Sequence, residues 1–129
     1  MRRSALLVWL VVSGAACPRA LGARAHHSFA ADFDITRPVT LTGRVTKIAW
    51  MNPHVHVDID AKGEPWSIEL GSPNGLRARG WTQKTLKAGD VVTIEGSRAK
   101  DGTNLANARA VVLPGGARLL TGSPQGKTS

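Results

Sequence analysis

The feature that most constrains the fold is a strict alternation of apolar and polar residues from His54 to Asp60. Val55, Val57 and Ile59 share one parity, and the polar residues between them share the other. A period of two is typical of a strand with one buried face. A turn at 61–63 follows, and then a segment in which Trp66, Ile68 and Leu70 repeat the alternation, so residues 54–70 are predicted to form a β-hairpin.

The preceding segment, residues 39–50, is predicted to form a long first strand. Its apolar residues change parity near Thr46-Lys47, which indicates a β-bulge, and Gly43 would ease a sharp bend. After the hairpin, Ser72 and Pro73 are typical of the cap and first turn of a short helix over residues 73–79.

Two further segments, 91–95 and 106–113, bring the predicted strands to five. Five strands with one short helix between the third and fourth predict an all-β fold, a small OB-like barrel. A different small barrel or a sandwich is the alternative. Nothing in the pattern defines an oligomeric state.

The first 25 residues have the features of a signal peptide. Met1-Arg2-Arg3 is basic, residues 5–12 are apolar, and Ala23-Arg24-Ala25 matches the Ala-x-Ala cleavage pattern. The apolar run is shorter than the roughly 20 residues that span a bilayer. We therefore expect cleavage after Ala25, a periplasmic or secreted location, and no stable membrane span after cleavage.

The predicted organisation is a signal peptide (1–25), an N-terminal arm (26–38), the OB-like barrel domain (39–114) and a flexible tail (115–129). Four of the 17 basic residues and none of the nine acidic ones lie in the signal peptide, so cleavage lowers the formal charge from +8 to +4. The case for a nucleic-acid partner weakens accordingly.

Cys17 is the single cysteine, and it lies within the predicted signal peptide. Cleavage after Ala25 would leave a domain with neither a disulfide nor a thiolate nucleophile. Lipidation of Cys17 is an alternative fate for this residue. The segment before it, Gly14-Ala15-Ala16, lacks the large aliphatic residue usual in a lipoprotein signal.

The four histidines form two pairs, His26-His27 at the predicted new N-terminus and His54-x-His56 on a predicted strand. Residues i and i+2 of a strand project from one face about 7 Å apart, so two imidazoles there can converge on one metal ion. Imidazole suits zinc, copper and nickel. Asp58 and Asp60 continue the same polar face as further or supporting ligands.

Cleavage after Ala25 would add a more specific feature, because the free amine and the imidazole of His26 could chelate one ion. With one further histidine, three nitrogens would suit the tetragonal geometry of Cu(II). Cleavage one residue earlier would place a histidine third from the amine, which also binds Cu(II). Against this, an exposed histidine pair is commonly only a solvated polar surface.

Catalytic residues are harder to identify. The predicted mature chain lacks cysteine and tyrosine, and Ser28 beside His27 resembles a nucleophile–base pair only in sequence. We therefore expect no enzyme, with a small copper redox site as a weaker option. Several lysines and arginines invite a nucleic-acid interpretation, but Trp50 and Trp66 fit the core better than a stacking surface, and export argues against it. We expect no nucleic-acid partner.

Several short motifs resemble a known family, an uncharacterised family of small exported bacterial proteins classed as a domain of unknown function. The resemblance runs from His26 to about Leu113, and it implies export, a small β-barrel and no established activity. The motifs, in order, are His26-His27-Ser28-Phe29, Thr42-Gly43-Arg44-Val45, Asn52-Pro53-His54, Glu69-Leu70-Gly71-Ser72-Pro73-Asn74, Arg79-Gly80-Trp81, Gly89-Asp90 and Ala99-Lys100-Asp101-Gly102.

The sequence thus leads to one main expectation, an exported binding module that holds a transition metal, copper, through His26, His27, His54 and His56. Members of the resembled family often carry another residue in place of His56, so the first three are the better candidates. The alternative is a module without metal, which binds an envelope protein or a small ligand with the surface around residues 71–81.

Overall fold

The computed structural model describes residues 29–123. Within this range the chain is mostly β, with six strands and two short helices. The predicted signal peptide (1–25) lies outside the described residues, as do His26 and His27. The elements are α1 (Phe29–Asp32), β1 (Phe33–Ala49), β2 (His56–Ala61), β3 (Glu64–Glu69), α2 (Pro73–Arg77), β4 (Val91–Ala99), β5 (Leu105–Val112) and β6 (Arg118–Leu120).

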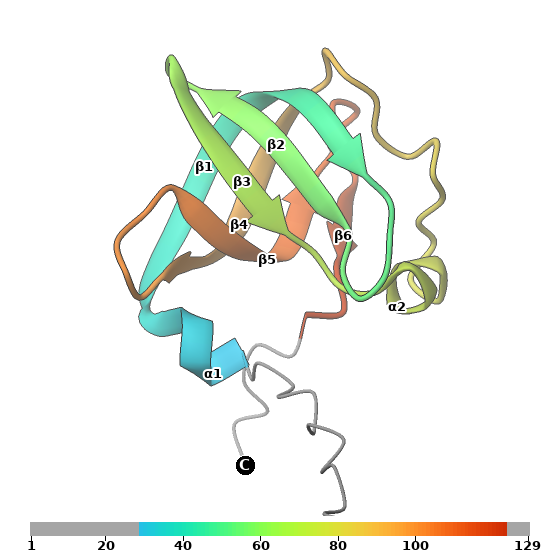
Figure 1. Cartoon of the computed structure of the whole chain (residues 1–129). Helices are drawn as coiled ribbons and strands as arrows, with labels where there is room; N and C mark the ends of the chain where they lie inside the picture. The colour runs from blue at the N-terminus through green and yellow to red at the C-terminus, as the bar shows by residue number, and fades with distance from the viewer. Residues whose placement is uncertain (1–28, 124–129) are drawn as a thin grey trace, which may run out of the picture.

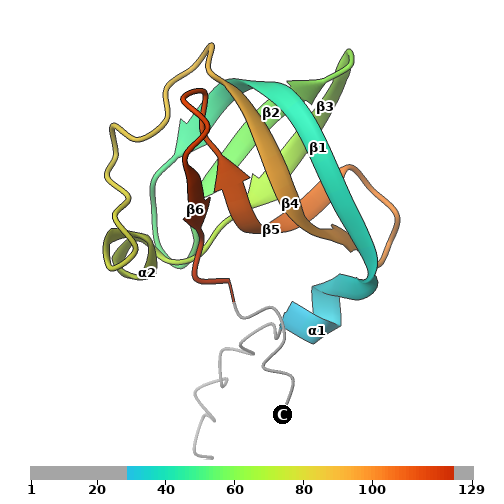
Figure 2. The ribbon, with the colours of Figure 1, turned by 180° about the vertical axis from the view of Figure 1, so that it is seen from behind.

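The strands form one hydrogen-bonded sheet in the order β3-β2-β1-β4-β5-β6, and β3 also pairs with β5. This additional pairing is parallel, whereas the neighbours in the sheet order are antiparallel. Each of the strands β1 to β5 therefore has hydrogen-bonded neighbours on both sides. Figures 1 and 2 show the strands curving around a common interior, with α1 and α2 at the same end of the molecule.

β1 is long enough to pair with β4 along its first part and with β2 along its last part. The register with β2 shifts between Val45 and Lys47, so the predicted bulge near Thr46-Lys47 is confirmed. At Gly43, a Cβ atom would lie 2.5 Å from the carbonyl oxygen of Asp60. Only glycine allows the two backbones to approach this closely.

The hairpin of β2 and β3 is also as predicted. Lys62 and Gly63 occupy its turn with positive φ angles of 54° and 81°, a two-residue turn that suits the twist of the strands. Ala61 pairs with Glu64 on either side, and the register continues to His56 opposite Glu69. The turn thereby fixes which side chains share a face.

The predicted inward residues of this hairpin are all buried. They pack with apolar side chains of β1, β4, β5 and α2 and of the segment after α2, and this burial is the main source of stability. The cluster comprises Val45, Val55, Val57, Ile59, Ala61, Trp66, Ile68, Leu70, Leu76, Trp81, Leu86, Val92, Ile94, Ala106, Ala108 and Val111.

α2 begins as predicted. The Ser72 hydroxyl accepts a hydrogen bond from the amide of Gly75 at 3.0 Å, and Pro73 lies in the first turn. This bond satisfies one of the free amides at the start of the helix. The helix ends at Arg77, two residues before the predicted end at Arg79.

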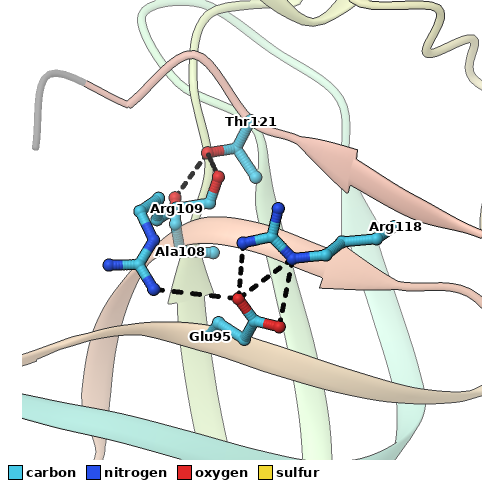
Figure 3. Close-up of polar contacts among 5 residues, drawn as sticks. All are labelled: Glu95, Ala108, Arg109, Arg118 and Thr121. Carbon is cyan, nitrogen blue, oxygen red and sulfur yellow. Dashed lines mark hydrogen bonds and ion pairs between the residues drawn. The ribbon is translucent and has the colours of Figure 1, made fainter.

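The prediction of five strands needs a correction, because the described residues contain a sixth, β6, within the range 115–129 predicted as a tail. Its composition is polar, but Arg118 makes a bidentate contact with Glu95 of β4, with a shortest distance of 2.6 Å (Figure 3). Leu119 packs against the core. At the other end, α1 and the first part of β1 lie within the predicted arm, where Phe29 stacks on Phe33 at 5.5 Å.

Candidate metal centre

Of the four predicted ligands, the structure describes His54 and His56. β2 begins at His56, so His54 belongs to the loop before it and not to the strand. Two backbone hydrogen bonds nevertheless continue the ladder there, from Val55 N to Gly71 O at 3.0 Å and from Leu70 N to Val55 O at 2.8 Å. Val55 is buried, and both histidines are half-buried.

The imidazole of His54 lies against a carboxylate. Its Nδ1 atom is 3.4 Å from Oε1 of Glu69, with side-chain exposures of 39% and 21%. A carboxylate that holds one ring nitrogen of a histidine orients the ring and leaves the other nitrogen for a metal ion. In this protein Nδ1 of His54 faces the carboxylate, and Nε2 is the ring nitrogen on the other side.

Glu69 is held in turn by Asn107 of β5, whose Nδ2 donates to the same Oε1 atom at 3.2 Å. Asn107 is 2% exposed and pairs with Glu69 in the parallel β3–β5 ladder. The hydroxyl of Ser123 donates to Oδ1 of Asn107. A series of polar contacts thus runs from Ser123 of the C-terminal segment through Asn107 and Glu69 to His54.

A cleft of about 230 Å³ adjoins this chain of contacts and separates Glu69 from α1. The helix α1 is attached on its other side, because the amide of Lys100 donates to the carbonyl of Asp32 at 2.9 Å and Lys100 Nζ donates to the carbonyl of Ala30. Figure 1 shows α1 below the end of the sheet where β3 ends and β2 begins. The cleft is lined by Ala31, Asp32, Phe33, Glu69, Ala99, Lys100, Asp101 and Leu105.

The cleft carries negative charge. Hydrogen bonds from the Thr103 hydroxyl and amide to Asp101 hold the pKa of this carboxyl below its usual value. With Asp32 and Glu69 also in the lining, three acidic residues face one lysine, whose ammonium is hydrogen-bonded to α1. Such a surface favours cations over anions.

The described residues alone do not complete a metal site. Between residues 29 and 123, no three histidine, cysteine, aspartate or glutamate side chains gather closely enough to hold an ion. Asp58 and Asp60, predicted as additional ligands, line a separate hollow with Thr46 and Ser67. Asp60 also accepts a hydrogen bond from the turn amide of Gly63 at 2.8 Å.

The alternative surface around residues 71–81 is apolar mainly on its inner side. Pro73, Leu76 and Trp81 are buried. The indole Nε1 of Trp81 donates to the carbonyl of Leu120 at 2.9 Å and joins this segment to β6. Its outer side presents the exposed residues Asn74, Arg77, Ala78 and Arg79.

Sequence reasoning did not identify Glu69, Asn107 or Ser123 as parts of the site. Glu69 could have been predicted from the hairpin, because a two-residue turn at Lys62-Gly63 places His56 opposite Glu69. The other two residues reach the site only through the parallel β3–β5 pairing and the docking of the C-terminal segment. No local pattern reports either contact.

Neither helix in the part of the chain that the structure describes has the length and apolar character needed to cross a bilayer. The fold and the site define a small, mostly β protein with a histidine–carboxylate pair at one end of its sheet. The chain belongs to a family of unknown function, DUF6152, whose model matches residues 14–108. An uncharacterised family is what the sequence motifs predicted.

No curated protein gives a significant match to this chain. Among solved structures, the chain is similar to TiaS in its crystallised complex with a transfer RNA and ATP, with a TM-score of 0.47 and 28% identity over 60% of this chain and 18% of that one. It is also similar to the ZRD-deleted mutant of TiaS in complex with agmatine, with a TM-score of 0.48 and 24% identity over 72% of this chain and 24% of that one. The chain therefore spans less than a quarter of these TiaS chains.

Proposed function

We propose that this protein is exported, is cleaved after Ala25, and binds copper outside the cytoplasm without catalytic turnover. The basic start, apolar run and Ala-x-Ala motif of residues 1–25 support export. We further propose that the strands form an OB-like barrel. The circle of pairings β1-β2-β3-β5-β4-β1, with a helix between the third and fourth strands, supports that assignment.

One observation carries the metal-binding proposal, the contact between Nδ1 of His54 and the carboxylate of Glu69. Because Nδ1 faces the carboxylate, Nε2 of His54 is the ring nitrogen placed to bind a metal ion. The same carboxylate lines the cleft beside α1, and α1 begins at Phe29, two residues after His27. The predicted amino terminus is therefore only a few residues along the chain from α1, which lines the cleft.

The proposed ligand set follows from this placement. His26 supplies its free amine and its imidazole, and His54 supplies Nε2. His27 or His56 supplies the remaining nitrogen, and His56 stands opposite Glu69 in the β2–β3 ladder. An all-nitrogen set of this kind suits Cu(II) in tetragonal geometry. Ligands from outside residues 29–123 are required, since the described residues do not gather three of their own.

Two measurements test the proposal. The intact mass of the protein recovered from the periplasm should correspond to a chain that begins at His26. A Cu(II) titration of that chain should show one tight site, and His26→Ala or His54→Ala should weaken it by at least about tenfold, the size of effect expected for loss of a metal ligand or its support. Equal affinity in all three proteins, or no binding, would remove the metal role.

A further inference from the structure

We infer that Asn107 is a positioning residue for the histidine site and that the C-terminal segment, residues 118–123, holds Asn107 in its working orientation. The inference rests on the proposed function for its role in metal binding. The position of the proton on the neutral His54 ring can be measured without any metal.

His54 and Asn107 share one carboxylate oxygen of Glu69. Oε1 of Glu69 lies 3.4 Å from Nδ1 of His54 and accepts a hydrogen bond from Nδ2 of Asn107 at 3.2 Å. The amide thus fixes the position of the oxygen that faces the imidazole. Asn107 is 2% exposed, so water competes little for this bond.

The imidazole of His54 faces this carboxylate with Nδ1. A carboxylate only accepts hydrogen bonds, so the nitrogen that faces it carries the proton in the neutral ring. Glu69 therefore selects the form of His54 that is protonated on Nδ1 and leaves the Nε2 lone pair free for a metal ion. A neutral histidine without such a partner carries its proton mainly on Nε2, where it blocks that ligand atom.

The side-chain amide of Asn107 is oriented by the C-terminal segment. The Ser123 hydroxyl donates to Oδ1 of Asn107, which directs Nδ2 toward Glu69. The amide of Ser123 donates to the hydroxyl of Thr121 at 3.4 Å. Thr121 is fully buried, and its hydroxyl donates to the carbonyl of Ala108 (Figure 3). The peptide of Thr121 also packs on Gly71, where a Cβ atom would lie 2.1 Å from the Thr121 carbonyl oxygen.

Nitrogen-15 NMR of the histidine rings tests the inference directly. The sample is the metal-free chain 26–129, which contains every described element, at about pH 8.5, above the usual imidazole range. We expect the proton of His54 on Nδ1 in the parent protein. Asn107→Ala should transfer most of it to Nε2, and Ser123→Ala should cause a smaller transfer in the same direction.

Val111→Ala is the matched control, because Val111 is a fully buried residue of the same strand whose backbone pairs with Ile94 and Leu119, whereas Asn107 pairs with Glu69. It should lower stability while the His54 proton stays on Nδ1. In a Cu(II) titration, Asn107→Ala should weaken binding by about 10- to 100-fold, and Val111→Ala should leave it unchanged.

The outcomes separate this inference from the proposed function. A parent protein with the His54 proton on Nε2, or an unchanged tautomer in Asn107→Ala, overturns the positioning role whether or not copper binds. The expected tautomers together with no copper binding would uphold the positioning role and overturn the proposed function.

Discussion

Arg118 of β6 and Glu95 of β4 are joined by a bidentate ion pair across β5, although 23 residues separate them in the chain. Arg109 of β5 adds a second, longer contact to the same carboxylate at 3.7 Å (Figure 3). This arrangement fastens the last described strand to the sheet. The segment that follows it reaches Asn107, and through Asn107 it reaches the candidate site.

The Glu95 contact predicts a pH dependence of stability. Hydrogen bonds from Arg118 hold the pKa of Glu95 below its usual value. A carboxyl with a lowered pKa in the folded state stabilises the fold above its unfolded pKa, about 4.3, and this contribution is lost as the pH falls through the lower folded value. Urea unfolding at about pH 7 and about pH 3 should show that Arg118→Ala reduces the difference in stability between the two conditions.

Lys87→Ala is the control for where the effect occurs, because Lys87 likewise lowers the pKa of a carboxyl, that of Asp90 at 2.8 Å, in the loop before β4. Hydrogen exchange adds a local measurement, since the amide of Thr121 donates to Arg109 O at 3.1 Å. That amide should exchange faster in Arg118→Ala and at the parent rate in Lys87→Ala. Equal rates in all three proteins would contradict the anchoring role of Arg118.

Gly71 provides a test of the docked C-terminal segment. An added Cβ would lie 2.1 Å from the backbone oxygen of Thr121, so one of the two backbones has to move. Gly71→Ala should cost about 1–3 kcal/mol of stability, the usual range for overpacking, measured by urea unfolding. Gly115→Ala has open space around its Cβ and should have a much smaller effect. A similar small loss for both variants would show that the segment is not docked as described.

Glu69 can be compared with a glutamate at the other end of the same strand. Glu69→Gln should weaken Cu(II) binding by about 10- to 100-fold, because a neutral amide oxygen holds the His54 ring less strongly than a charged carboxylate does. Glu64→Gln removes the same charge from the exposed hairpin end of β3 and should leave the affinity unchanged. Equal losses would indicate a general effect of charge and would contradict an orienting contact.

The hairpin of β2 and β3 shows what local sequence can predict. Alternation placed Val57 and Ile68 in the core, and the turn predicted at 61–63 is present, with Lys62 and Gly63 at positive φ. The bulge near Thr46 was predictable for the same reason, because a change of parity within one strand requires an extra residue. These features depend on neighbours within a few residues.

The C-terminal part shows where such reasoning fails. Residues 115–123 are rich in glycine and polar side chains, which predicts a tail. Their attachment depends on Glu95, Asn107 and Ala108, which lie 13 or more residues away in the chain. For the same reason the sequence indicated His54 but not the partners that orient it.

The most direct test of the central claim, that the amino terminus and His54 bind one copper ion together, is a double-mutant cycle on Cu(II) affinity. The proteins are the chain from His26, His26→Ala, His54→Ala and the double variant. Ligands of one ion are coupled, so the loss in the double variant should be clearly smaller than the sum of the two single losses. Additive losses, or no loss from either single change, would contradict the account.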